Sequence, residues 1–123
     1  MTTIAELNKW LKKPEGVNLE FKMARTGFNE SKDLPDYCAA LANEGGGKLV
    51  LGVDDNAKIV GTEAFQGTFN KLSNKLWQSL RIRVDVEEIQ HPQGRVLIFH
   101  IPSRPRGKAI QSTGSYKYPW RLG

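Results

Sequence analysis

Apolar residues recur at helical spacing in three parts of this 123-residue chain, and each part predicts a helix. A capping box that begins at Thr3 starts the first helix, which runs to about Lys13, where a proline follows. The second helix has Asp33 as its capping residue and ends at glycines 45–47. Its buried stripe consists of Leu34, Tyr37, Cys38 and Leu41. The third helix spans roughly residues 64–80 and has the clearest period in the chain.

Alternating apolar and polar residues predict strands between these helices. Residues 17–23 alternate strictly, so Glu20 and Lys22 are expected to project from the same face. The apolar run 49–53 predicts a buried strand, and a turn then leads into a short strand at residues 59–60. That unit is expected to be a hairpin.

The last third of the chain predicts a second hairpin and an extended end. Residues 83–89 and 95–101 form the two strands of that hairpin. In the closing segment, alternate positions hold the aromatic residues Tyr116, Tyr118 and Trp120. Pro119 limits that segment to an edge strand. The expected fold is a single α+β domain over residues 1–123, with a mixed β-sheet and hairpins flanked by about three helices.

Composition narrows the classes of function. Hydrophobic content of 39% and charged content of 25% are ordinary for a soluble globular domain. No stretch reaches the roughly 18 apolar residues that a membrane helix needs, and no signal peptide is visible. Cys38 has no second cysteine to pair with, and His91 and His100 do not form a usual zinc site. These features predict a cytoplasmic protein without a membrane partner.

The positive charge is unevenly distributed. The formal net charge is +5, yet residues 1–88 hold 12 Lys and Arg against 13 Asp and Glu, whereas residues 89–123 hold 6 against none. Such a one-sided segment favours a polyanionic partner, above all nucleic acid, although a solvated basic tail explains the charge alone equally well. The interleaved aromatic residues either stack on bases or close the core. The candidate nucleic-acid contacts are Lys22, Arg25, Arg104, Arg106, Lys108, Lys117 and Arg121.

Three carboxylates form a candidate metal site. Glu15, Glu20 and Asp55 carry the oxygen ligands that Mg²⁺ prefers. Five residues along a straight strand would place the two glutamates on opposite faces, so the chain must bend near Gly16. The ordinary alternative is an ion pair of Glu20 with Lys22 and a turn role for the aspartates.

The glycine-rich turn at residues 45–47 does not match a phosphate-binding loop. That motif requires a glycine where Ala42 stands, a hydroxyl residue where Leu49 stands, and a strand that leads into a helix. Here a predicted helix leads into a strand, and the C-terminal end of a helix repels anions. The turn is therefore expected to be a helix cap, and no nucleotide cofactor is expected.

Five short blocks in fixed order resemble the Schlafen AlbA-type domain, a family formerly grouped as a divergent AAA domain. The blocks are Glu15, Glu20-Phe21-Lys22, Asn43 to Gly47, Gly52 to Asp55, and Arg121-Leu122-Gly123. The resemblance implies nucleic-acid binding, of DNA or RNA, and in bacteria a place at the N-terminus of longer transcriptional regulators. Animal members include metal-dependent endoribonucleases that cut transfer RNA with two glutamates and an aspartate.

Position by position, the resemblance assigns that acidic set to Glu15, Glu20 and Asp55. Gly16 stands where the family usually has serine, and Asn56-Ala57 replaces a turn that usually contains glycine. If the domain is an enzyme, the three carboxylates are expected to hold Mg²⁺ or Mn²⁺ while Lys22 steadies the developing negative charge. The animal enzymes clasp RNA between paired lobes, so a single domain would need a homodimer to do the same.

Overall fold

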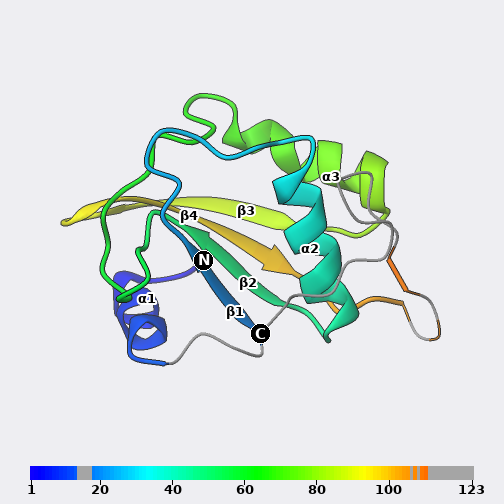
Figure 1. Ribbon diagram of the computed structural model, residues 1–123, viewed down its shortest axis with the longest axis horizontal. Coiled ribbons are helices and arrows are strands. Elements are labelled where there is room, and N and C mark those ends of the chain that lie inside the picture. The colour runs from blue at the N-terminus through cyan, green and yellow to red at the C-terminus, as the bar shows by residue number, and fades with distance from the viewer. Residues whose placement is uncertain (14–17, 106, 108, 111–123) are drawn as a thin grey trace.

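A four-stranded mixed sheet organises the fold. The computed structural model describes residues 1–13, 18–105, 107 and 109–110. The strands are β1 (Leu19–Lys22), β2 (Gly47–Leu51), β3 (Asp85–His91) and β4 (Gly94–Ile101), and the sheet order is β1-β2-β4-β3 (Figure 1). β1 pairs with β2 in parallel, and the other two pairs are antiparallel. The expected α+β class with a mixed sheet is confirmed.

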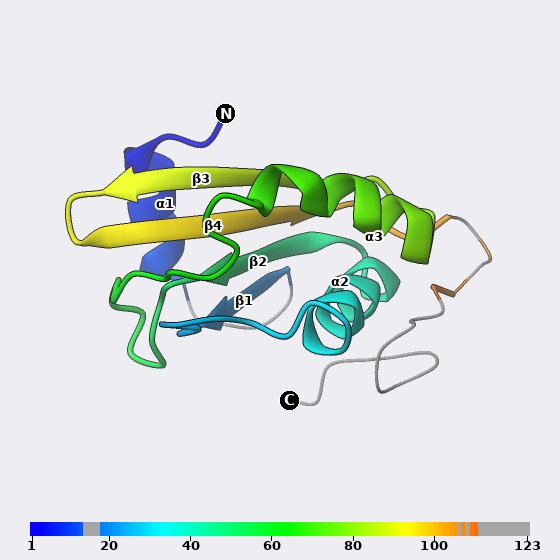
Figure 2. The same cartoon turned by 90° about the horizontal axis from the view of Figure 1, so that it is seen from above.

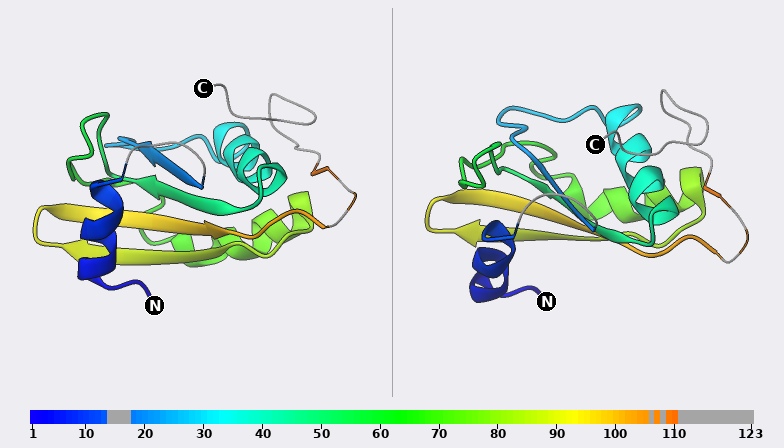
Figure 3. Two further views of the ribbon diagram at one scale, coloured as in Figure 1. Left: turned by 90° about the horizontal axis from the view of Figure 1, so that it is seen from below. Right: turned by 60° about the horizontal axis from the view of Figure 1, so that its bottom comes forward.

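The helices divide between the two faces of the sheet. They are α1 (Ile4–Leu11), α2 (Asp33–Asn43) and α3 (Leu72–Leu80), the last preceded by the short 3₁₀ turn η1 (Phe69–Lys71). Alternation along β2 sends Leu49 and Leu51 into the core beneath α2 and α3, and Val50 into the core beneath α1. Figures 2 and 3 show α1 on one face and the other two helices on the opposite face. The sheet is therefore covered on both faces.

The first two helices begin as their local hydrogen bonds dictate. The predicted capping box is present in α1, where Thr3 and Glu6 bond each other's backbone N–H groups. Asp33 was expected to cap α2, but it is the first residue of the helix. The side chain of Asn29 instead accepts hydrogen bonds from the N–H groups of Ser31 and Lys32. An Asx turn thus precedes the helix, and the carbonyl of Asn29 accepts a hydrogen bond from the N–H of Leu34, a donor that a capping side chain would otherwise satisfy.

The third helix is shorter than its apolar period predicts. Residues 64–68 form turns, and the α-helix begins only at Leu72. Phe65 and Gly67 both have positive φ, at 53° and 77°, which is incompatible with a right-handed helix. The periodicity therefore marks the buried face correctly, while the start of the helix was predicted too early.

The two predicted hairpins differ in outcome. The hairpin over residues 83–101 is confirmed as β3 and β4, joined by a two-residue loop. The one after β2 is reduced to a single bridge between Val53 and Ile59, so the predicted strand at 59–60 does not form. Val60 and Gly61 both donate to the carbonyl of Gly52, which curls the chain out of the sheet. The aromatic segment 116–120 lies outside the described residues.

Candidate functional site

A carboxylate, an ammonium and an aromatic ring meet between β1 and α2. β1 lies at one edge of the described sheet, and its register pairs Glu20 with Leu49, so Glu20 and Lys22 project toward the face that α2 covers. Lys22 Nζ lies 3.9 Å from Glu20 Oε2 and 4.7 Å from the ring centre of Tyr37. The Lys22 side chain is 35% exposed and the Glu20 side chain 13% exposed, so the lysine reaches solvent more than the glutamate does. The expected projection of Glu20 and Lys22 from one face is confirmed.

The turn after β2 treats its two aspartates differently. Asp54 Oδ1 accepts hydrogen bonds from the N–H groups of Asn56 and Lys58, each at 2.9 Å, and so closes the turn. Asp55 is exposed and makes no hydrogen bond or ion pair with the described residues. The turn role considered for both aspartates is therefore filled by Asp54 alone.

The same turn is tied to the end of β1. The carbonyl of Lys22 accepts hydrogen bonds from the N–H groups of Gly52 and Val53, at 2.8 and 3.2 Å. Lys22 and the aspartate turn thus share one end of the sheet. Glu15 lies outside the described residues, and within them no group of three His, Cys, Asp or Glu is arranged to hold a metal ion. The three-carboxylate site stays a prediction.

Two further predicted cations follow β1 and β4. Arg25 is exposed just after β1, and its carbonyl accepts a hydrogen bond from the N–H of Glu63. Arg104 is half-buried at the C-terminal end of α2, where its N–H donates to the carbonyl of Ala42 at 2.9 Å. The structure therefore places Arg104 beside α2, and Arg25 beyond the end of β1 that carries Lys22. The remaining candidates, Arg106, Lys108, Lys117 and Arg121, lie outside the described residues.

Asn43 anchors the segment that follows β4, a role that sequence reasoning missed. Its side-chain Oδ1 accepts from the N–H of Ile110 at 2.6 Å, and its Nδ2 donates to the carbonyl of Ile110 at 3.2 Å. Both residues are buried, at 5% and 6% exposure. The only signal in the sequence was an amide in the last turn of a predicted helix, where a hydrophobic or small residue would be usual.

The glycine-rich turn is a helix cap, as predicted. It follows α2 and precedes β2, and the N–H of Gly46 donates to the carbonyl of Leu41 at 2.7 Å. A Cβ at Gly46 would lie 2.8 Å from the backbone nitrogen of Ser103. The absent side chain thus admits the chain that leaves β4.

A polar cluster on the α1 face ties the N-terminus to the sheet. Thr2 donates to Glu87 through both its N–H and its hydroxyl, at 3.0 and 2.6 Å, and the ring of His100 contacts the same carboxylate. Burial by itself raises the pKa of Glu87, but these hydrogen bonds and the nearby charge of His100 outweigh it, so the pKa lies below its usual value. Trp10 from α1 packs edge-on against the His100 ring. This cluster joins α1 to β3 and β4 and has a structural role.

Cys38 is equally structural. Its side chain is fully buried in α2, and burial raises the pKa of its thiol far above the ordinary value. The thiol is therefore neutral and shielded from solvent, as the sequence predicted.

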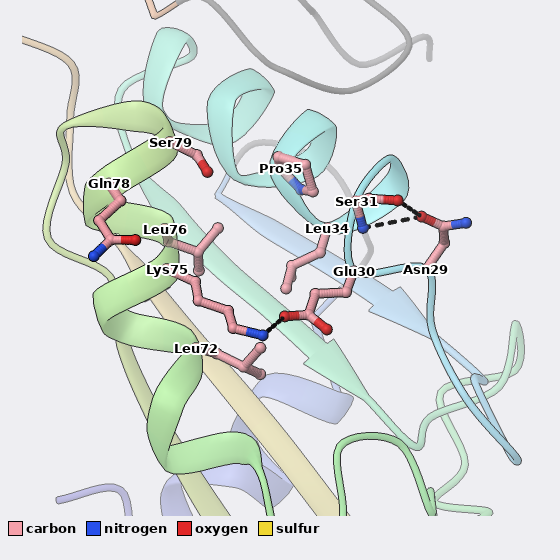
Figure 4. A pocket seen from close by; sticks show the side chains of 10 residues that line it. All are labelled: Asn29, Glu30, Ser31, Leu34, Pro35, Leu72, Lys75, Leu76, Gln78 and Ser79. Atoms are coloured by element: carbon pink, nitrogen blue, oxygen red, sulfur yellow. Dashed lines mark hydrogen bonds and ion pairs between the residues drawn. The ribbon is translucent and has the colours of Figure 1, made fainter.

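A pocket of about 660 Å³ opens between α2 and α3, away from the predicted site residues. Figure 4 shows Lys75 and Glu30 joined across its mouth, with Leu34, Leu72 and Leu76 forming its apolar floor. The Lys75–Glu30 ion pair is 2.6 Å long and exposed. None of the predicted catalytic or nucleic-acid-binding residues lines this pocket.

Solved structures with the same fold come from bacteria. The crystal structure of the DIP2311 protein from Corynebacterium diphtheriae matches 87% of this chain with a TM-score of 0.65 and 24% identity. This chain spans about a quarter of that protein, 24% of its length. The second is the solution NMR structure of the N-terminal domain of a protein from Nitrosomonas europaea named for its relation to the ATP-dependent DNA helicase RecG. It matches 95% of this chain and 86% of that domain, with a TM-score of 0.63 and 21% identity.

The fold is that of a small α+β domain, which in both neighbours forms part of a longer bacterial protein. A comparison with curated proteins found no match. The model of the family described as "Schlafen, AlbA_2" matches residues 15–123. Since this is most of the chain, the protein belongs to the Schlafen AlbA_2 family. Among the described residues no helix is long and apolar enough to cross a membrane.

Proposed function

We propose that this domain binds nucleic acid through the side of the molecule formed by β1, α2 and the segment after β4. The observation that carries the proposal is the placement of Lys22 and Arg104 beside α2, with Arg25 just after β1, in a protein of net charge +5. Family membership and the name of the RecG-related neighbour support the same role. We also propose, as the sequence predicts, that the protein acts in transcriptional regulation, that it is cytoplasmic and that it forms a homodimer.

Each cation has a structural reason to contact a phosphate backbone. Lys22 is held over the Tyr37 ring, whose neighbour Phe28 lies 6.2 Å away between ring centres. An ammonium beside half-buried aromatic rings loses little freedom on binding a phosphate. The backbone of Arg104 is held at Ala42, so its side chain starts from a fixed point of the main chain. Such contacts neutralise phosphates without reading base order.

The test is fluorescence anisotropy with labelled single-stranded and duplex oligonucleotides at several salt concentrations. Arg104→Ala and Lys22→Ala should weaken binding and reduce the slope of log affinity against log salt by roughly one each. Lys9→Ala removes an exposed cation of α1, on the face of the sheet opposite α2 (Figures 2 and 3), and serves as the matched control. Equal slopes for all four proteins would rule out this interface.

A second candidate function is cleavage of transfer RNA or other structured RNA by a metal-dependent site. The observation that favours it lies in the turn after β2, where Asp54 makes the structural hydrogen bonds and Asp55 is exposed. The donor chemistry fits a hard cation, because carboxylate oxygens are what Mg²⁺ and Mn²⁺ prefer. We propose that Glu15, Glu20 and Asp55 would hold such an ion.

The chain's own groups would then act on the phosphodiester. A bound divalent ion supplies Lewis acidity at phosphorus. Lys22 projects from the same face as Glu20, at 3.9 Å, and in this proposal its ammonium meets the negative charge that develops on the phosphate oxygens. The cations along α2 would orient the RNA.

The aspartate pair provides an internal control for this second function. Purified protein is incubated with transfer RNA and Mn²⁺, and cleavage is followed on denaturing gels. Asp55→Asn and Glu20→Gln should abolish cleavage, whereas Asp54→Asn should loosen the turn and leave cleavage measurable. Cleavage at the same rate by the wild type and by both Asp55→Asn and Glu20→Gln would eliminate the carboxylate site.

A further inference from the structure

The outer surface of α3 carries cations with no carboxylate among them. Residues 64–84 contain Lys71, Lys75, Arg81 and Arg83 but no Asp or Glu. Residues 1–88 hold nearly equal numbers of cations and carboxylates, so a stretch with four cations and no carboxylate is unusual there. All four cationic residues are exposed. Lys75 is already paired with Glu30, so the cations that remain on this surface are Lys71 and Arg81, at the two ends of α3.

The acidic residues that follow are directed elsewhere. Asp85 begins β3 opposite His100, and alternation along the strand places Val84 and Val86 in the core beneath α3. Asp85 and Glu87 therefore project to the α1 face. Arg83 does so too, because it lies between the core residues Ile82 and Val84. Glu88 returns to the α3 side, but it is bound by Arg95 at 2.5 Å. The positive surface of α3 is thus not neutralised from β3.

Trp77 adds an exposed aromatic face to these cations. It is 46% exposed, which is uncommon for a side chain of this size outside an interface. The guanidinium of Arg81 lies 5.8 Å from the Trp77 ring centre. An indole next to cations is the combination with which proteins hold unpaired bases and their phosphates.

The backbone at Arg81 supports a role beyond stability. Arg81 ends α3 in the left-handed conformation, at φ 59° and ψ 30°, and its N–H donates to the carbonyl of Trp77. Glycine or asparagine is the usual residue there, because a Cβ is strained in this region. An arginine at such a position costs stability that glycine would not. Arginine, unlike glycine, places a guanidinium next to the Trp77 ring.

We infer that Lys71, Trp77 and Arg81 form a docking surface for a single nucleic-acid strand. This α3 surface deepens the proposed function and rests on it. It lies over the β3 side of the sheet, whereas β1 is at the opposite edge (Figures 1 and 2). A strand long enough to follow the molecule would therefore have a second point of contact. The surface commits to an unpaired strand, because a base stacks on Trp77 only when it is not already in a duplex.

The experiment measures anisotropy of a fluorescein-labelled 12-nucleotide oligodeoxythymidine, and of a duplex of equal length, with the full chain. The double variant Lys71→Ser, Arg81→Ser should bind the single strand at least tenfold more weakly. Its salt slope should be smaller by about 1.4, since each phosphate contact on a single strand contributes about 0.7. The control variant Lys9→Ser, Lys12→Ser has the same net charge, and both of its substituted residues are exposed elsewhere. It should bind at least threefold more tightly than the α3 double variant.

Two single variants test stacking on Trp77 and backbone strain at Arg81 separately from the general loss of positive charge. Trp77→Leu should weaken single-strand binding about fivefold or more and leave duplex binding within twofold. Arg81→Gly should weaken single-strand binding while the melting temperature stays equal or rises, because the strained residue is gone. A purely structural role for Arg81 predicts the reverse pattern.

The outcomes distinguish this inference from the proposed function. If the wild type binds and the α3 variants bind as it does, the α3 surface is refuted and the β1–α2 interface stands. If both double variants lose affinity equally, the effect is general charge and the α3 surface is refuted. If the wild type binds neither oligonucleotide, both proposals fail.

Discussion

Asn43 should be one of the most sensitive polar residues in the domain. Asn43→Ala removes two buried hydrogen bonds to Ile110 and leaves the N–H and carbonyl of Ile110 without their side-chain partner. Each buried group that loses its partner costs about 1–3 kcal/mol. Because the segment around Ile110 can partly detach and reach water, the expected loss is about 2–4 kcal/mol. That is a large share of the roughly 5–15 kcal/mol by which a domain is stable.

The assay is urea unfolding combined with hydrogen exchange at the amide of Ile110. The variant should unfold at lower urea, and Ile110 should lose protection even under native conditions. Asn74→Ala is the matched control, since Asn74 is exposed on α3 and should change the free energy of unfolding by no more than about 0.5 kcal/mol. If Asn43→Ala costs less than that and the Ile110 amide stays protected, the anchoring role is refuted.

Two further predictions concern the glycine turn and the polar cluster on the α1 face. Gly46→Ala should lower the melting temperature well beyond Gly45→Ala: both glycines have positive φ, but only at Gly46 would a Cβ meet backbone, 2.8 Å from Ser103 N, whereas nothing lies within 4 Å at Gly45. Equal effects would show that the close approach is unimportant. The lowered pKa of Glu87 means that its carboxylate stabilises the fold above the ordinary value of 4.5, and that this stability is lost as the pH falls through the range below it. Glu87→Gln should therefore flatten the dependence of melting temperature on pH in that acid range, and an unchanged dependence would contradict the assignment.

The elements that the sequence predicted well are those in which the local pattern and the tertiary packing agree. Strict alternation placed Glu20 and Lys22 on one face of β1, and the capping box set the start of α1. Errors arose where backbone conformation overrode an apolar period. Phe65 continues the period of α3, yet its positive φ belongs to a turn that no propensity for phenylalanine indicates.

Long-range contacts were the least predictable part of the site. The pairing of Asn43 with Ile110 joins residues 67 positions apart, and nothing in either local pattern specifies it. The sequence indicated a basic last third correctly, since that is a count of charges. It did not indicate a ligand surface on α3, because cations on the outer face of a helix are most simply explained as solvated. Only the structure places Trp77 and Arg81 beside each other.

The most direct test of the central claim is a salt titration of nucleic-acid binding by the wild-type domain, followed by anisotropy of labelled transfer RNA and of labelled single-stranded DNA. A domain that contacts phosphates through these cations should bind at low salt, and its log affinity should fall linearly with log salt, with a slope of several units. Absence of binding at 50 mM salt, or an affinity that does not change with salt, would contradict it.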